Sequence, residues 1–170
     1  MRALALALSC LPLLAGPVLA GPMPALPDLP PLPSGYDNVG TSGWYAGLLG
    51  GFETGAGIED GFEAAIVIGN MVVAADILLG VELMATADEH GGGALEASAR
   101  VGAPVGGSLG VFASAGLGYD FDRDGFAVIG LGAEADLGND WALRADYRLN
   151  IDLNDEPVSH RVLIGFVKRF

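Results

Sequence analysis

Basic residues and cysteine are scarce in this chain of 170 residues. Its 8 lysines and arginines stand against 21 aspartates and glutamates, which gives a formal net charge of −13 at pH 7. Nucleic-acid binding needs a basic face that neutralises phosphates, so this balance excludes nucleic acid as a partner and disfavours electrostatic adhesion to anionic lipid. The single cysteine, Cys10, lies in the apolar start of the chain, so the remainder has no disulfide and no thiolate metal ligand or nucleophile.

Long apolar runs are also missing. Hydrophobic residues make up 51% of the chain, but no segment after residue 20 has the roughly 18 uncharged apolar residues that a membrane helix requires. The longest candidate, residues 64–75, is bounded by Glu63 and Asp76. Apolar residues can instead alternate with polar ones on strands that close into a barrel, which leaves no unpaired backbone group in lipid. The alternative, a soluble periplasmic β-protein, would have to expose outward Leu, Ile, Val and Ala side chains to water.

The start of the chain has the composition of an export signal. Arg2 precedes an apolar stretch over residues 3–15, and small residues precede Gly21. This order predicts a secretory signal peptide, residues 1–20, with cleavage after about Ala20. Its removal would take away Arg2 and no acid, which changes the net charge from −13 to −14. Lipidation at Cys10 is the alternative, and it is disfavoured because a second apolar run would then remain in the exported protein.

The rest of the chain divides into two regions. Six of the 10 prolines fall between residues 22 and 33, so residues 21–43 are predicted to form an extended Pro-rich periplasmic spacer. Residues 44–170 instead alternate between apolar and polar side chains with a period of two. The clearest segment is 141–153, in which Trp141 and the following odd positions are apolar while the even positions include Arg144, Asp146 and Arg148. A strand separates these sets onto two faces, whereas a helix would mix them.

The same alternation predicts the number of strands. Further strands are expected near residues 44–53, 62–69, 73–83, 95–103, 109–120, 127–137 and 158–170. Turn signals fall at Gly69-Asn70, 105–108 and 138–140 on one side, and at 54–60, 88–93, 122–125 and 154–157 on the other. We therefore predict an all-β fold over residues 44–170, an eight-stranded antiparallel up-and-down transmembrane β-barrel. An even number of strands places both ends of the barrel on one side, which we expect to face the periplasm.

Four segments resemble a known family. The last strand, Val162 to Phe170, reads VLIGFVKRF and resembles the terminal signal of outer-membrane proteins, from which Lys168 departs because that position is usually apolar or aromatic. Residues 141–148, 130–134 and 43–47 resemble, in turn, the penultimate strand, the strand before it and the first strand of small opacity-protein-like and outer-membrane-protein-A-like barrels. The resemblance covers residues 43–170.

The resemblance implies a place in the cell more than a reaction. It implies the bacterial outer membrane, contact with outer-membrane lipid and lipopolysaccharide, and recognition by the outer-membrane assembly machinery through Phe166 and Phe170. We expect a monomer with a structural or surface-interaction role, as in surface antigens of the porin family, with no catalysis and no cofactor. The alternatives are a narrow channel for small solutes or ions and, less favoured, a lipid A-modifying enzyme.

Charged residues gather on the face predicted to point inward. They are Glu82, Glu96, Arg100, Glu134, Asp136, Arg144, Asp146, Arg148 and Arg161. The interior of an eight-stranded barrel is just wide enough for side chains to fill it. We therefore predict a salt-bridge network that plugs the lumen, with Glu134 paired to Arg144 or Arg148 on the neighbouring strand. The alternative is a gated ion path.

Three short motifs suggest other chemistry. Residues 120–125 resemble the opening of a calcium loop, but the twelfth position holds Leu131 where an acid is needed, so an acidic surface hairpin is favoured and weak divalent-cation binding stays open. Residues 130–135 match a dinucleotide-binding glycine pattern, yet strand alternation continues through them without a helix. Ser159 and His160 are adjacent on a predicted strand and so point to opposite faces, which argues against a hydrolytic pair.

Overall fold

The computed structural model describes residues 42–55, 59–74, 76–122, 124–153 and 158–170. The predicted signal peptide, residues 1–20, lies outside the described residues, and so does the predicted spacer up to residue 41. The strands begin at Gly43. No helix among the described residues is both long enough and apolar enough to cross a membrane.

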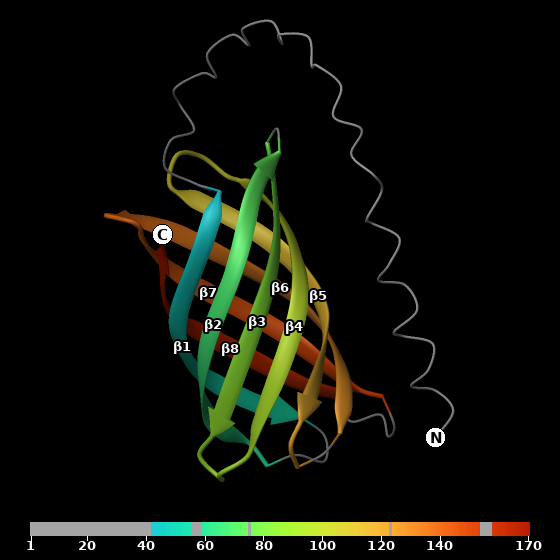
Figure 1. Ribbon diagram of the computed structural model, residues 1–170. Coiled ribbons are helices and arrows are strands. Elements are labelled where there is room, and N and C mark those ends of the chain that lie inside the picture. The colour runs from blue at the N-terminus through green and yellow to red at the C-terminus, as the bar shows by residue number, and fades with distance from the viewer. Residues whose placement is uncertain (1–41, 56–58, 75, 123, 154–157) are drawn as a thin grey trace, which may run out of the picture. The chain divides into compact units, whose positions relative to one another are not determined.

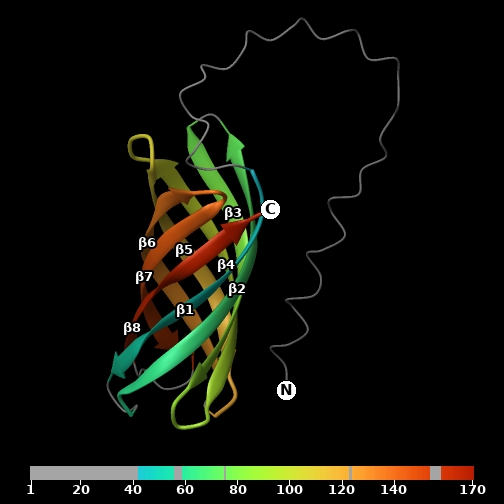
Figure 2. The same ribbon diagram turned by 90° about the vertical axis from the view of Figure 1, so that its left-hand side faces the viewer.

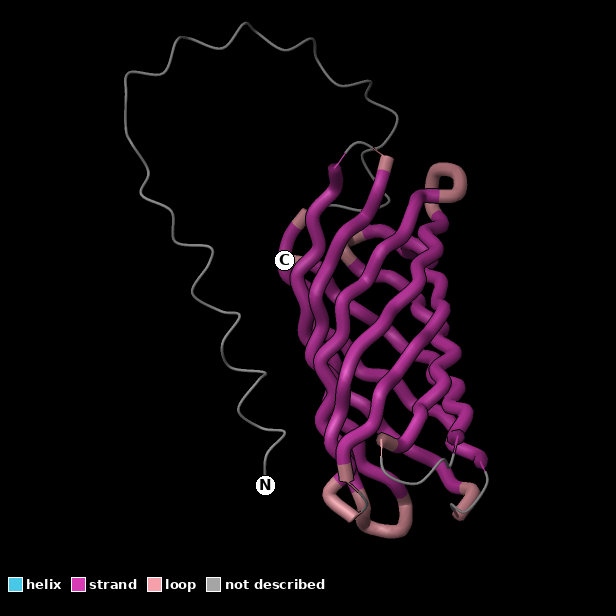
Figure 3. Tube along the Cα trace, turned by 90° about the vertical axis from the view of Figure 1, so that its right-hand side faces the viewer, coloured by secondary structure: helices cyan, strands magenta, loops and turns pink. Residues whose placement is uncertain are grey.

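Eight strands form one closed antiparallel barrel, as predicted. The strands are β1 (Gly43–Gly55), β2 (Gly61–Ala74), β3 (Ile77–Asp88), β4 (Gly93–Pro104), β5 (Leu109–Asp120), β6 (Gly125–Gly138), β7 (Trp141–Asp152) and β8 (Val158–Arg169). Each strand pairs with the next along the chain, and β8 pairs with β1 to close the barrel (Figures 1 and 2). The strands lean steeply around the barrel, and the tube in Figure 3 shows short connections between them. The up-and-down topology leaves no unpaired edge in the barrel wall.

The two ends of the barrel differ in what they carry. At one end, called the terminal end below, Phe170 N donates to the carbonyl oxygen of Trp44 over 2.9 Å, so β1 starts where β8 finishes. The connections after β2, β4 and β6 share this end. The connections after β1, β3, β5 and β7 form the opposite end, called the loop end. Both boundaries of the barrel therefore lie on one side, as the even strand number requires.

One predicted turn is wrong. Gly69-Asn70 was expected to separate two strands, but β2 runs through both residues, and the chain turns beside Asp76 instead. Gly69 is the register partner of Tyr45 on β1. A Cβ atom at position 69 would collide with the Tyr45 phenol and lie 2.7 Å from the carbonyl oxygen of Val81. This glycine therefore makes room for a tyrosine side chain inside the barrel, and its sequence signal is the same as that of a turn.

The outer wall is apolar. Along each strand, exposed and buried residues alternate, and large apolar side chains such as Leu48 and Leu131 are 67% and 65% exposed on the outside. Trp44 and Trp141 lie on the outer wall near the terminal end, and the Phe52–Phe62 ring pair, with centroids 5.4 Å apart, lies near the loop end. Apart from tyrosines, His160 and Lys168 are the only ionisable side chains at outward strand positions in the described part of the chain. Charge is therefore concentrated inside the barrel and in its connections.

Candidate functional site

The structure places the nine predicted charged side chains inside the barrel. Eight of them are at most 5% exposed, and Asp136 is half-buried near the terminal end. They come from β3, β4, β6, β7 and β8, because strand alternation turns every second residue of these strands inward. Most of these side chains meet one another, and the contacts are organised around Glu82.

Glu82 on β3 is the centre of the network. Its carboxylate accepts hydrogen bonds from Arg144 Nη2 at 2.9 Å, Arg148 Nη2 at 2.8 Å and Arg100 Nη1 at 3.2 Å. The phenol of Tyr45 also donates to it, over 2.7 Å. Glu82 is 3% exposed, so its negative charge is stabilised almost entirely by these partners and not by water.

Arg144 and Arg148 on β7 share their acids. Arg144 Nε donates to Asp146 Oδ2 over 2.9 Å in addition to its contacts with Glu82. Arg148 Nη1 contacts Glu96 on β4, and its Nη2 lies 3.5 Å from Asp146 Oδ2. Each guanidinium therefore touches acids from more than one strand. The planar fork of arginine suits such multiple contacts better than a lysine ammonium would.

Arg100 on β4 is held between acids and aromatic rings. Its Nη2 donates to Glu134 Oε1 over 2.9 Å and its Nη1 to Tyr45 Oη over 2.7 Å. The guanidinium carbon lies 3.5 Å from the centroid of the Phe112 ring, in cation–π contact. Sequence reasoning missed Tyr45 and Phe112 as members of the network. The available signal was an aromatic side chain on the inward face of a strand whose neighbours on that face are small or polar.

The predicted partner of Glu134 is wrong. Glu134 and Arg144 are register partners on β6 and β7. The ion pairs of Glu134 within the described chain are nevertheless with Arg100 and with Arg169 Nη2, at 2.9 and 2.8 Å. Arg144 is directed instead toward Glu82 on the opposite wall. Register fixes which Cα atoms face each other, but a long arginine side chain can reach across a narrow lumen, so register does not fix the partner.

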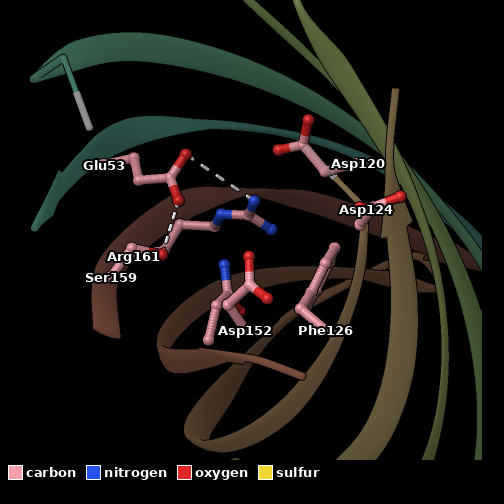
Figure 4. A pocket seen from close by; sticks show the side chains of 8 residues that line it. Glu53, Asp120, Asp124, Phe126, Asp152, Ser159 and Arg161 are labelled. Atoms are coloured by element: carbon pink, nitrogen blue, oxygen red, sulfur yellow. Dashed lines mark hydrogen bonds and ion pairs between the residues drawn. The ribbon is translucent and has the colours of Figure 1, made fainter. Parts of the chain in front are cut away.

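A second group of charges surrounds Arg161 at the loop end. Arg161 Nε lies 2.9 Å from Glu63 Oε1 and its Nη2 lies 3.8 Å from Glu53 Oε2. Ser159 Oγ donates to Glu53 Oε1 over 2.6 Å. Figure 4 shows the Arg161 guanidinium directed into a small pocket, which is also lined by the aspartates Asp120, Asp124 and Asp152. Sequence reasoning missed Glu53 and Glu63, although both lie on the inward face of their strands.

Apolar side chains fill the interior beside the ionic network. Tyr45, Leu49, Val67, Met84 and Leu163 belong to one buried cluster that spans β1, β2, β3, β7 and β8. Phe126 and Val128 form a smaller cluster with Ala94. The interior is therefore occupied by packed side chains, both charged and apolar.

The other motifs do not assemble into sites. Ser159 points inward to Glu53, whereas His160 points outward, where its Nδ1 lies 2.7 Å from Tyr147 Oη. Residues 130–135 lie within β6 and lead into no helix. Asp120 Oδ1 accepts a hydrogen bond from the backbone N–H of Asp122 at the start of a hairpin. The described residues contain no group of three or more His, Cys, Asp or Glu side chains placed to hold a metal ion.

Comparison with protein-family models gave no match, and comparison with curated proteins gave none either. Solved structures do match. Neisserial surface protein A (NspA) is 16% identical, with a TM-score of 0.56 over 76% of this chain and 98% of that one. A de novo designed transmembrane β-barrel is 18% identical, with a TM-score of 0.55 over 76% and 98%. The N-terminal β-barrel domain of OprF from Pseudomonas aeruginosa is 16% identical, with a TM-score of 0.50 over 75% and 99%.

These structures match this chain over nearly their whole length, and the part matched is the barrel. At such low identity the likeness concerns the fold and not the activity. The strand number, the antiparallel closure and the position of both barrel boundaries at one end agree with the architecture expected from residues 43–170. The chain therefore has the fold of the small eight-stranded outer-membrane β-barrels.

Proposed function

We propose that this chain is an integral outer-membrane barrel with a closed interior and a structural or surface-interaction role, without catalysis. The observation that carries the proposal is the ion pair between Glu82 on β3 and Arg144 on β7. These strands lie on opposite walls, so the pair crosses the lumen. Arg100 and Arg148 converge on the same carboxylate from two further directions.

Location in the outer membrane is supported by the outer wall. Large apolar side chains cover it between the aromatic residues near the two ends, as the lipid-facing band of an outer-membrane barrel requires. Exposure of so many Leu, Ile and Val side chains to water would be strongly unfavourable. Structures that share the fold include a designed transmembrane β-barrel and NspA, which is named as a surface protein.

A closed interior is supported by the energetics of the network. A solute passing along the axis would have to separate Glu82 from three arginines in a region with little water. Removing one partner from a buried ion pair costs about 3–5 kcal/mol. Steady conduction is therefore disfavoured, and a channel function is the less favoured alternative.

Two measurements test this proposal. The first is migration of the protein from purified outer membranes on a detergent gel, with and without boiling; we expect a band that stays with the outer-membrane fraction and shifts on boiling. A soluble, non-shifting protein would overturn the membrane assignment.

The second measurement is single-channel recording of the unmodified protein in planar bilayers, for which we expect no steady openings. Steady openings that change on substitution of Arg148 would instead establish the channel.

One partner follows from the same proposal. We infer that the assembly machinery recognises β8 through Phe166 and Phe170, which are 52% and 76% exposed and lie toward the terminal end. Phe170→Ala is expected to lower the amount of heat-modifiable protein in the outer membrane, with Leu153→Ala at the loop end as the control.

The absence of catalysis is tested by mass spectrometry of lipid A from a deletion strain, which we expect to be unaltered.

A further inference from the structure

A hydrogen-bonded pair of polar side chains interrupts the apolar outer wall. Tyr147 on β7 and His160 on β8 both point outward and are exposed, and Tyr147 Oη lies 2.7 Å from His160 Nδ1. Polar groups facing lipid are unfavourable unless they are hydrogen-bonded. The pair satisfies only part of the hydrogen-bonding capacity of its two side chains.

The pair presents a donor to whatever lies against the wall. In the neutral ring, a phenol O–H donating to Nδ1 leaves the imidazole hydrogen on Nε2, and this N–H is a donor. Thr54 on β1 is the register partner of His160 and also points outward, so a hydroxyl lies on the neighbouring strand. The three side chains together form a polar patch toward the loop end of a wall on which most side chains are apolar.

A shallow, open apolar groove on the outer wall reaches Tyr147, one member of this patch. It crosses β4 to β8 and is lined by Val101, Val111, Leu131, Tyr147 and Val162, together with Asp146 and further small or apolar residues. Val101 lies near the terminal end of β4, whereas Tyr147 lies in the middle of β7. Leu131 is the register partner of Tyr147, so the groove runs from strand to neighbouring strand. Because the strands are tilted, this course also rises toward the loop end. His160 lies beyond Tyr147 toward the loop end, so the groove leads from the terminal side up to the polar patch.

The chemistry of groove and patch matches one class of ligand. An unbranched acyl chain fits an apolar groove, and the carbonyl oxygen at its head would accept hydrogen bonds from His160 Nε2 and Thr54 Oγ1. A phosphate fits less well, because the chain carries a net charge of −13 and the loop-end connections include Glu59, Asp60 and Glu89. Neutral donors beside acidic loops favour an uncharged acceptor over an anion.

We propose that Tyr147 and His160 form a binding site for the acyl carbonyl of a membrane lipid whose chain lies in the β4–β8 groove. This inference rests on the proposed function, since the site needs a barrel embedded in lipid. Tyr147 acts as a positioning residue that fixes the imidazole, and His160 contacts the lipid. Such a contact would order one lipid at this wall and leave neighbouring lipids mobile.

Native mass spectrometry tests the site. The full chain is mixed in detergent with phosphatidylethanolamine that carries either ester-linked or ether-linked chains, and the detergent is removed in the mass spectrometer. The two lipids differ in the carbonyl and share the headgroup. Retention of the ester lipid is expected to exceed that of the ether lipid by roughly five- to tenfold, as expected for one or two hydrogen bonds. His160→Leu and Tyr147→Phe are both expected to remove the difference. Tyr119→Phe is the matched control, because Tyr119 is an outward tyrosine on β5 with 53% exposure, and it is expected to keep the difference.

The outcomes separate this inference from the proposed function. Only protein that shifts on boiling enters the experiment, so a failure to shift would contradict the membrane barrel itself. Equal retention of ester and ether lipids by a shifting protein would overturn the lipid site alone. A preference that survives His160→Leu, or that follows headgroup charge when phosphatidylglycerol replaces phosphatidylethanolamine, would overturn it as well.

Discussion

Arg144 on β7 reaches across the barrel to Glu82 on β3, where its Nη2 donates to Oε1 over 2.9 Å. Both side chains are fully buried. In the closed order of eight strands, three strands separate β3 from β7 in either direction, so the pair joins diametrically opposite walls. The contact ties the stability of the barrel to the closure of its lumen, because both depend on the same buried charges.

Replacing Arg144 is expected to destabilise the barrel strongly. Arg144→Met leaves Glu82 and Asp146 buried with less positive charge, and we expect the free energy of unfolding to fall by about 3–5 kcal/mol. Urea titration in lipid vesicles, followed by fluorescence of Trp44 and Trp141, measures the change. Lys168→Met on the outer wall is the control, with an expected loss of less than about 1 kcal/mol. If Arg144→Met lowers stability as little as the control does, then Arg100 and Arg148 are sufficient to stabilise the buried charge of Glu82.

The contribution of the Arg100–Phe112 contact to the stability of the barrel can be measured separately from packing. Phe112→Leu keeps an apolar side chain but removes the ring that lies 3.5 Å from the Arg100 guanidinium. Phe126→Leu is the matched control, since Phe126 clusters with Ala94 and Val128. We expect Phe112→Leu to lower the free energy of unfolding by about 1–2 kcal/mol more than Phe126→Leu, by the same urea titration. Equal losses would mean that the ring contributes through packing alone.

A substitution at Gly69 tests whether this glycine makes room for the Tyr45 side chain inside the barrel. An added Cβ atom at this position would press on Tyr45, which hydrogen-bonds both Glu82 and Arg100. Gly69→Ala is therefore expected to destabilise the barrel by about 1–3 kcal/mol through overpacking. At Gly50 the nearest atom to an added Cβ is the Glu63 carbonyl oxygen at 3.9 Å, so Gly50→Ala is expected to change stability little. Tolerance of Gly69→Ala, with thermal shift as the readout, would argue that Tyr45 can leave the network without loss.

A charge placed on the outer wall should lower the free energy of unfolding by an amount that depends on its depth in the bilayer. Leu131 lies in the middle of β6 and is 65% exposed, whereas Leu153 lies at the loop end and is 61% exposed. Leu131→Arg is expected to lower the free energy of unfolding in vesicles by about 2–4 kcal/mol, and Leu153→Arg by at most about 1 kcal/mol. Equal effects at the two positions would contradict a bilayer around the middle of the barrel.

The alternation of side chains along the chain was sufficient for much of the architecture. The even positions from Arg144 to Arg148 and the inward acids Glu82 and Glu96 are placed by strand geometry alone, since successive side chains of a strand point to opposite faces. The same period leads to eight strands, to closure and to both barrel boundaries at one end. It separates Ser159 from His160 for the same local reason.

Long-range packing decided the rest. Gly69 looks like part of a turn in the sequence, but in the barrel it makes room for the Tyr45 phenol, because the pairing of β1 with β2 places Tyr45 opposite it. Glu134 faces Arg144 in register yet pairs with Arg100 and Arg169, and Arg144 pairs with Glu82 on the far wall. Local periodicity fixes the face on which a side chain lies. Which charges meet depends on the width of the lumen and on the reach of each side chain, and those are properties of the closed barrel.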